Sequence, residues 1–316
     1  MIEREEVDDY VAMRQYRQIN SVLVWQEDEI LLERYYNGYT SESRNVMRSV
    51  VKSILSIAAG ICLDKGLLPS LDEPIYHYLD DFAQNIHPYH KAITVRHLLS
   101  MSSGIYWVGG VHYHCPQLSL MRRSADWITF ISEVDITSVP GTKYNYSEFD
   151  VILLTAVLQE AIQGGIFDFI RKNLYEPLEI QGGPWWTSKC GIAYSCANAG
   201  AGNGEPEEQQ SNLTAREMLR IGQLFLEGGK FNGRRIVSSA YVEQAITPLK
   251  QNPEYGYLWW LGEANRGKKW YGCRGFGGQS ITVLPDKQRI VVVQATPTAR
   301  GMKYDDLVEW LINCPD

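Results

Sequence analysis

A serine and a lysine three residues apart are the first candidates for chemistry in this chain. The stretch RSVVKS, residues 48–53, contains the only S-x-x-K pattern in the sequence. Residues three apart lie on one face of a helix, so the Ser49 hydroxyl and the Lys52 amine can meet. Apolar neighbours would desolvate Lys52 and favour its neutral amine, which could then accept the Ser49 proton. Because the pattern also occurs by chance in chains of this length, it needs the support of other motifs.

Two further stretches contain groups that could assist a nucleophilic serine. In PGTKYNYSEFD, residues 140–150, a turn leads into a helical pattern, and Tyr146 could act as a base or pass a proton to a leaving group. In CRGFGGQ, residues 273–279, the glycines allow close backbone approach, and an amide there could donate to an oxyanion. Taken alone, each stretch also has a structural interpretation, because loop tyrosines commonly pack and glycine-rich segments commonly turn.

The elements that must position these residues are strands at both ends of the chain and helices between them. The apolar runs 21–26 and 29–36 are separated by a short polar turn, which predicts an antiparallel hairpin. The run VVKSILSIAAGICL is apolar on nearly all sides and predicts a core helix that starts at Ser49 and stops at Lys65-Gly66. Helical segments continue to about residue 235, and short β-rich runs with a closing helix follow.

This order of elements predicts one domain inserted into another. We expect an α/β domain with an antiparallel sheet, made from residues 1–66 and 236–316. We expect residues 67–235 to form a mostly helical inserted domain.

The motifs, taken in order, resemble one family. Several stretches, in this order, are similar to the serine β-lactamase-related hydrolases. They are RSVVKSILSIAAGICLDKGLL, ITVRHLLSMSSGIYW, PGTKYNYSEFDVILL, and YGYLWW followed by GFGGQSITVLPD. These include class C β-lactamases, low-molecular-weight penicillin-binding proteins, esterases and 6-aminohexanoate-dimer-hydrolase-like enzymes. The resemblance extends from about residue 20 to residue 300. It implies an α/β (α+β) fold of the β-lactamase/transpeptidase-like type, with an antiparallel sheet flanked by helices.

The resemblance implies roles for individual residues. Ser49 matches the acylated nucleophile, Lys52 matches its proton-accepting partner, and Tyr146 matches the tyrosine of the family's Y-x-N motif. The backbone amides of Ser49 and Phe276 match the oxyanion pair, because residues 273–275 align with the K-T-G or H-x-G motif. These roles imply acyl-enzyme hydrolysis of a small ester, an amide or a D-amino-acid peptide, without a cofactor. Whether Lys52 or Tyr146 is the acylation base stays open.

Two departures from the family pattern bear on the substrate. Glu148 stands where Y-x-N has an amide that helps to hold a substrate amide, and a carboxylate has the opposite hydrogen-bonding preference. Cys273 stands where the third motif has Lys or His, so a penicillin carboxylate loses its usual partner unless Arg274 reaches it. Both departures argue against β-lactams. We expect Glu148, Cys273, Arg274, Gly275 and Trp107 to contact the substrate instead.

Other interpretations of the sequence stay open but have less support. The segment 112–115, HYHC, contains metal-ligating residue types, yet no second cluster accompanies it, and we predict no metal. Cys273 as a nucleophile has no histidine nearby in sequence. A non-catalytic binding or scaffold protein that keeps the fold is the alternative from another class, suggested by the altered motifs. A pure binder, however, has no need for Ser49 together with Lys52.

Composition and charge limit the partners. The 316 residues include 30 Lys and Arg against 37 Asp and Glu, a net charge of −7, which is the wrong sign for holding nucleic acid or an anionic membrane. No apolar leader opens the chain, and no apolar run reaches about 18 residues. The 6 cysteines are scattered, which predicts reduced thiols. We expect a cytoplasmic protein that binds a small-molecule ester or amide, and its oligomeric state stays open.

Overall fold

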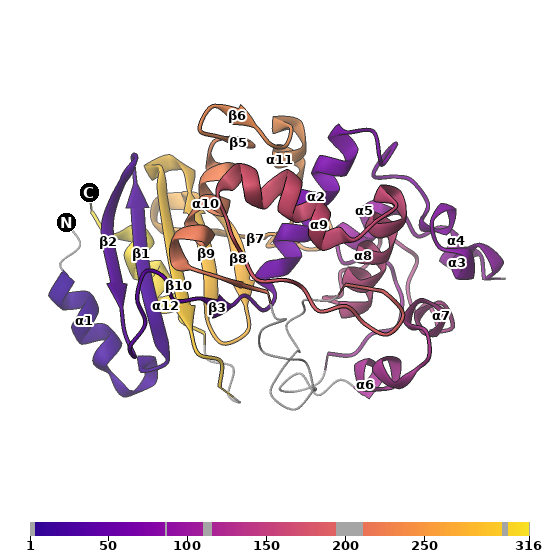
Figure 1. Ribbon diagram of the computed structural model, residues 1–316, viewed down its shortest axis with the longest axis horizontal. Coiled ribbons are helices and arrows are strands. Elements are labelled where there is room, and N and C mark those ends of the chain that lie inside the picture. The colour runs from indigo at the N-terminus through magenta and orange to yellow at the C-terminus, as the bar shows by residue number, and fades with distance from the viewer. Residues whose placement is uncertain (1–3, 86, 110–115, 194–210, 299–302, 316) are drawn as a thin grey trace.

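A six-stranded antiparallel sheet joins the two ends of the chain (Figure 1). The computed structural model describes residues 4–85, 87–109, 116–193, 211–298 and 303–315. The strand order is β2-β1-β10-β9-β8-β7, and each neighbouring pair is antiparallel. The strands are β1 (Ile19–Gln26), β2 (Glu29–Tyr35), β7 (Trp260–Glu263), β8 (Lys269–Gly275), β9 (Gln279–Leu284) and β10 (Arg289–Ala295). The predicted hairpin is confirmed, and its strand β1 pairs with β10 from the opposite end of the chain.

The middle of the sheet is buried on both faces. In β1, Leu23 contributes to one hydrophobic core and Val22 to the other, as alternate residues of a strand must. Helices α1 (Arg4–Ala12) and α12 (Asp305–Asn313) supply apolar residues to one of these cores. On the opposite face, α10 (Ala215–Leu226) packs against β9 and β10. Burial on both faces explains why β10 contains four consecutive apolar residues, 290–293, rather than an alternating pattern.

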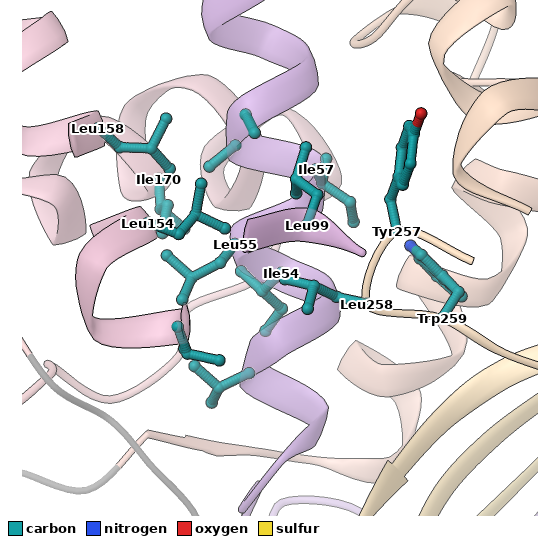
Figure 2. Close-up of a cluster of buried hydrophobic side chains, with 14 of the residues drawn as sticks. Ile54, Leu55, Ile57, Leu99, Leu154, Leu158, Ile170, Tyr257, Leu258 and Trp259 are labelled. Atoms are coloured by element: carbon teal, nitrogen blue, oxygen red, sulfur yellow. The ribbon is translucent and has the colours of Figure 1, made fainter. Parts of the chain in front are cut away.

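Helix α2 (Val50–Asp64) is the core helix that the sequence predicts, with Ser49 as its N-cap residue. Every residue from Val50 to Cys62 is buried. Figure 2 shows Ile54, Leu55 and Ile57 directed into a cluster with Leu99, Leu154, Leu158, Ile170, Tyr257, Leu258 and Trp259. A fully buried side chain of this size stabilises the fold by about 1.5–3 kcal/mol. The packing therefore holds the N-terminal end of α2, and Ser49 with it, in a fixed position.

Helices and two pairs of two-residue strands are the regular elements that the structure describes between β2 and β7. The helices are α3 (Asp80–Gln84), α4 (Pro88–Lys91), α5 (Val95–Leu99), α6 (Pro116–Arg123), α7 (Trp127–Ser132), α8 (Glu148–Ile162), α9 (Ile166–Ile170) and α11 (Ser239–Ala245). Two-residue strands form the pairs β3 (Asn45–Val46) with β4 (Asn212–Leu213) and β5 (Lys230–Phe231) with β6 (Arg234–Arg235). Figure 1 shows α2, α5 and α8 beside the sheet. The division into domains at residues 66 and 236 stays a prediction.

The described helices are short in relation to the thickness of a membrane. No single helix among the described residues is long and apolar enough to cross a membrane. Helix α8 and the segment Ile166–Leu178, which bend by 74° relative to each other, reach that length and composition together. In α8, the residues from Glu148 to Leu158 are buried inside the protein.

Candidate active site

Ser49 lies at the entrance to α2, directly after a residue with an unusual backbone conformation. Arg48 has a φ of 51°, in the left-handed region that residues with a side chain rarely adopt. The Lys52 Nζ donates a hydrogen bond to the Ser49 Oγ over 3.0 Å, so the hydroxyl faces the lysine. Ser49 is half-buried and lines the main pocket. The positive end of the α2 dipole favours negative charge that develops at this position.

Lys52 is buried and contacts two functional groups at once. Its side chain is 2% exposed, and its Nζ lies 2.8 Å from the Glu148 Oε1. The same Nζ lies 5.2 Å from the centre of the Tyr146 ring, a distance at which a cation interacts with a ring face. The structure therefore brings together Ser49, Lys52 and Tyr146, the three predicted catalytic residues, and adds the Glu148 carboxylate.

Glu148 does not occupy the position that the sequence suggested. We expected it to contact the substrate, but its side chain is 4% exposed and forms an ion pair with Lys52. It is not among the described residues that line the pocket. The first turn of α8 directs Glu148 toward α2, and these two helices pack together. Its carboxylate therefore faces Lys52 rather than the pocket.

The segment before α8 places Tyr146 in the pocket wall. Ser147 caps α8 by accepting hydrogen bonds from the amides of Phe149 and Asp150, which ends the turn immediately after Tyr146. The Tyr146 ring stacks on Trp260, with ring centres 5.9 Å apart and planes inclined by 27°. Both rings line the pocket that contains Ser49.

The end of β8 lies against the residues that precede Ser49. A Cβ atom at Gly275 would lie 2.5 Å from the Met47 carbonyl oxygen and 3.2 Å from the Arg48 Cβ, so only glycine fits this approach. Phe276 follows immediately and lines the same pocket as Ser49 and Gly275. This arrangement is consistent with the predicted oxyanion pair, the Ser49 and Phe276 amides.

Cys273 and Arg274 point to opposite sides of β8, as neighbouring residues of a strand do. Cys273 is fully buried, and burial raises the pKa of its thiol to about 12. It is not one of the described residues that line the pocket, so its predicted contact with substrate is corrected to a place in the core. Arg274 does line the pocket. Its guanidinium lies 4.8 Å from the centre of the Trp270 ring, and its Nη1 donates to the Thr282 Oγ1 over 2.8 Å.

Trp107 packs against Phe149 and is hydrogen-bonded to Asn145, so it contacts the segment that contains Tyr146. The Trp107 side chain is buried, and its ring packs edge-on against Phe149 with centres 4.7 Å apart. Its carbonyl oxygen accepts a hydrogen bond from the Asn145 Nδ2 over 2.9 Å. Since the described pocket lining does not include it, the predicted substrate contact of Trp107 is corrected to a packing role.

The pocket has a volume of about 620 Å³ and extends from Ser49 toward α12. Its apolar lining includes Trp260, Leu261, Trp270, Val308 and Ile312, and its charged lining includes Glu254, Glu263, Arg274, Lys303, Asp305 and Glu309. Sequence analysis missed the contributions of β7 and α12. The sequence predicts both elements, but no motif marks them, because they line the pocket only through tertiary packing. Strand β7 pairs with β8, and α12 packs against β9 and β10.

The described part of the chain offers neither a cluster of metal ligands nor a disulfide. Among the described residues, no group of three or more His, Cys, Asp or Glu side chains could hold a metal ion. The segment 112–115, which contains metal-ligating types, lies outside the described residues. Cys62, Cys190, Cys273 and Cys314 are free thiols.

The sheet, the buried α2 and the Ser49–Lys52 contact define a β-lactamase/transpeptidase-like fold, which confirms the expected fold class. A sequence model of the beta-lactamase family matches residues 7–312. The chain therefore belongs to the beta-lactamase family, a family of hydrolases, and the resemblance that its motifs suggested is confirmed.

Individual relatives cover most of the chain at low identity. A 6-aminohexanoate-dimer hydrolase from Paenarthrobacter ureafaciens is 22% identical over 298 residues, which are 86% of this chain and 71% of the relative. The octameric penicillin-binding protein homologue from Pyrococcus abyssi is 18% identical, with a TM-score of 0.75 over 98% of this chain and 77% of its own. A D-stereospecific amidohydrolase from Streptomyces sp. is 14% identical, with a TM-score of 0.71 over 94% of each chain. The two solved structures establish the fold.

Proposed function

We propose that this protein is a serine hydrolase that forms an acyl-enzyme on Ser49. The observation that carries the proposal is the hydrogen bond of 3.0 Å between the Lys52 Nζ and the Ser49 Oγ, at the N-terminal end of α2 and open to a pocket. A nucleophilic hydroxyl needs an adjacent proton acceptor, and this pair supplies both groups.

The remaining steps use groups that line the same pocket. The Ser49 Oγ attacks the substrate carbonyl carbon, and the backbone amides of Ser49 and Phe276 stabilise the oxyanion of the tetrahedral intermediate. One such donor typically contributes a factor of about 10²–10³ to the rate. Tyr146 assists the transfer of a proton to the leaving group, and water then hydrolyses the acyl-enzyme.

The proposed substrate is a small ester, an amide or a D-amino-acid peptide. The pocket supports this because it combines apolar walls, such as Trp260 and Ile312, with the Arg274 cation. Cys273, which takes the place of the family's Lys or His, is buried beneath the pocket and provides no cation for a penicillin carboxylate. Relatives named as amide hydrolases agree with this substrate class at low identity.

Covalent labelling tests the proposed function. A fluorophosphonate and a penicillin-type probe are each incubated with the protein, and intact-protein mass spectrometry measures the adduct. We expect a single adduct on Ser49 from at least one probe, and no adduct on Ser49→Ala. Ser53→Ala is the matched control, because Ser53 lies on the same helix but donates to the Leu258 carbonyl over 2.7 Å. If neither probe labels the native protein, the hydrolase proposal is wrong and the binding-protein alternative is favoured.

A further inference from the structure

Three polar groups form a continuous chain from the pocket into the core. The Ser49 Oγ lies 3.0 Å from the Lys52 Nζ, and the Lys52 Nζ lies 2.8 Å from the Glu148 Oε1. Ser49 faces the pocket, whereas the Lys52 and Glu148 side chains are 2% and 4% exposed. The outer end of the chain is therefore accessible to substrate, and the inner end is shielded from water.

The carboxylate changes what the lysine can do. A carboxylate beside a buried amine favours the ammonium form, because the opposite charges compensate for their lost hydration. An ammonium group has three donors and no acceptor, so it cannot take a proton from Ser49 without giving one away. The Glu148 Oε1 lies within hydrogen-bond distance of the Lys52 Nζ and can accept that second proton.

We propose that Glu148 receives the proton of Ser49 through Lys52, as the inner end of a three-residue proton relay. The proposal rests on the proposed acyl-enzyme function. As the C–O bond to the substrate carbon forms and the Ser49 O–H bond breaks, the Ser49 proton moves to the Lys52 Nζ. One of the Lys52 protons moves at the same time to the Glu148 Oε1. The net change is one proton from Ser49 to Glu148, with negative charge now on the substrate oxyanion. When the intermediate collapses, the proton returns through Lys52 toward the leaving group, and Glu148 is again a carboxylate.

Other titratable side chains pack around this chain of three groups. Tyr144 and Tyr146 from the loop before α8, Tyr255 before β7, and Cys273 from β8 surround it. Burial raises the pKa of Tyr144, Tyr255 and Cys273, so these three groups stay neutral near pH 7. Two residues after Glu148, Asp150 faces Ser103, whose hydroxyl donates to it over 2.6 Å.

The relay predicts how the rate of Ser49 acylation depends on pH when the Glu148 carboxylate is removed. The relay needs the Glu148 carboxylate as its inner acceptor, so a variant without that carboxylate tests it directly. In Glu148→Gln the inner acceptor is lost while the shape is kept. Acylation then depends on the fraction of Lys52 that is already neutral, and that fraction increases with pH.

The experiment is the pH dependence of Ser49 labelling by a fluorophosphonate, from about pH 5 to about pH 10, where rate profiles report the essential base. We expect the rising limb of Glu148→Gln to move to higher pH by about one unit or more, with Glu148→Asp restoring part of the native profile. A shift to lower pH would show that Glu148 only stabilises the ammonium form, which overturns the relay. A uniform loss without a shift would show a purely structural role and overturns it as well.

Controls separate this proposal from the proposed function and from general effects of charge loss. If native protein is labelled at Ser49 but Glu148→Gln fails to shift the profile, the relay is wrong and the hydrolase proposal stands. An absence of labelling in the native protein refutes both. Asp150→Asn removes another buried carboxylate from the same helix, and an equal shift in that variant would overturn the assignment to Glu148.

A measurement on the native protein covers the case in which the variants do not fold. The acylation rate is measured in mixtures of H₂O and D₂O. Two protons in flight, one from Ser49 and one from Lys52, produce a curved dependence of the rate on the deuterium fraction. A straight line would indicate a single transferred proton and would contradict the relay.

Discussion

Two buried glutamates, each paired with a cation, have very different surroundings. Glu217, in the first turn of α10, accepts hydrogen bonds from the Arg44 guanidinium and from the backbone amides of Gln181 and Thr214, over 2.7–3.1 Å. It ties together three segments and forms a capping box with Thr214. Glu148 instead contacts a lysine that also donates to a pocket-lining serine. Burial and an ion pair do not distinguish these two glutamates, because both have them. The difference is that the cation beside Glu148, Lys52, also contacts Ser49 in the pocket wall.

The largest expected effect comes from removing the Lys52 amine, which lies between Ser49 and Glu148. Lys52→Met should lower Ser49 acylation by a factor of about 10²–10⁴, because the proton acceptor is gone. It should also lower the free energy of unfolding by about 3–5 kcal/mol, since Glu148 is left buried without its partner. Labelling rates and urea unfolding measure the two effects. The double variant Lys52→Met with Glu148→Leu should regain stability but no activity; recovery of labelling would contradict the role of Lys52.

A third buried carboxylate, Asp150, extends the comparison to a group without a cation. Burial raises its pKa from 3.8 to about 7, against the opposing effect of its hydrogen bonds with Ser103. At this site the folded protein therefore binds more protons than the unfolded chain between those values, so the contribution of Asp150 to the free energy of unfolding falls as pH rises from about 4 to about 7. In Asp150→Asn this fall should be smaller. Chemical unfolding at several pH values measures it, and an unchanged pH dependence would refute the assignment.

Removing the structural glutamate should affect stability without affecting chemistry. Glu217→Gln keeps one of two accepting oxygens and loses the charge that pairs with Arg44, so we expect a loss of about 1–3 kcal/mol in the free energy of unfolding. The pH profile of Ser49 labelling should stay unchanged. A shifted profile would erase the distinction between the two glutamates.

The smallest expected effect concerns Arg274, which lines the pocket. Arg274→Gln should raise KM about tenfold for an ester that carries a carboxylate, which corresponds to one lost charge-assisted hydrogen bond of about 1.4 kcal/mol. A neutral ester of the same size is the matched control and should be unaffected. Equal changes for the two esters would show that Arg274 only shapes the pocket.

The predictions that the structure confirms depend on patterns within a single element. Ser49 and Lys52 are three residues apart, so a single helix is enough to bring their side chains together, and the contact was predictable before any fold was known. The apolar character of residues 50–62 likewise predicts a buried helix wherever the rest of the chain lies. The order of the motifs suggested the family, which the match over residues 7–312 confirms.

Predictions that depended on distant packing were less accurate. Lys52 and Glu148 are 96 residues apart in sequence, and their contact depends on how α2 packs against α8. In β8, alternation implies that Cys273 and Arg274 face opposite sides, but it does not say which side is the pocket. Trp107 belongs to a stretch that resembles a family motif, and we expected it to contact the substrate. Its ring packs against Phe149 rather than lining the pocket.

The sequence by itself determined the contact between Ser49 and Lys52, the strands at the two ends and the core helix between them, because each depends on spacing within one element. Only the tertiary structure decided what surrounds that pair. It placed Glu148 on the inner side of Lys52, Cys273 in the core and α12 along the pocket. The physical reason is that side-chain burial and ion pairing between elements are fixed by how the elements pack, and no local periodicity encodes that packing.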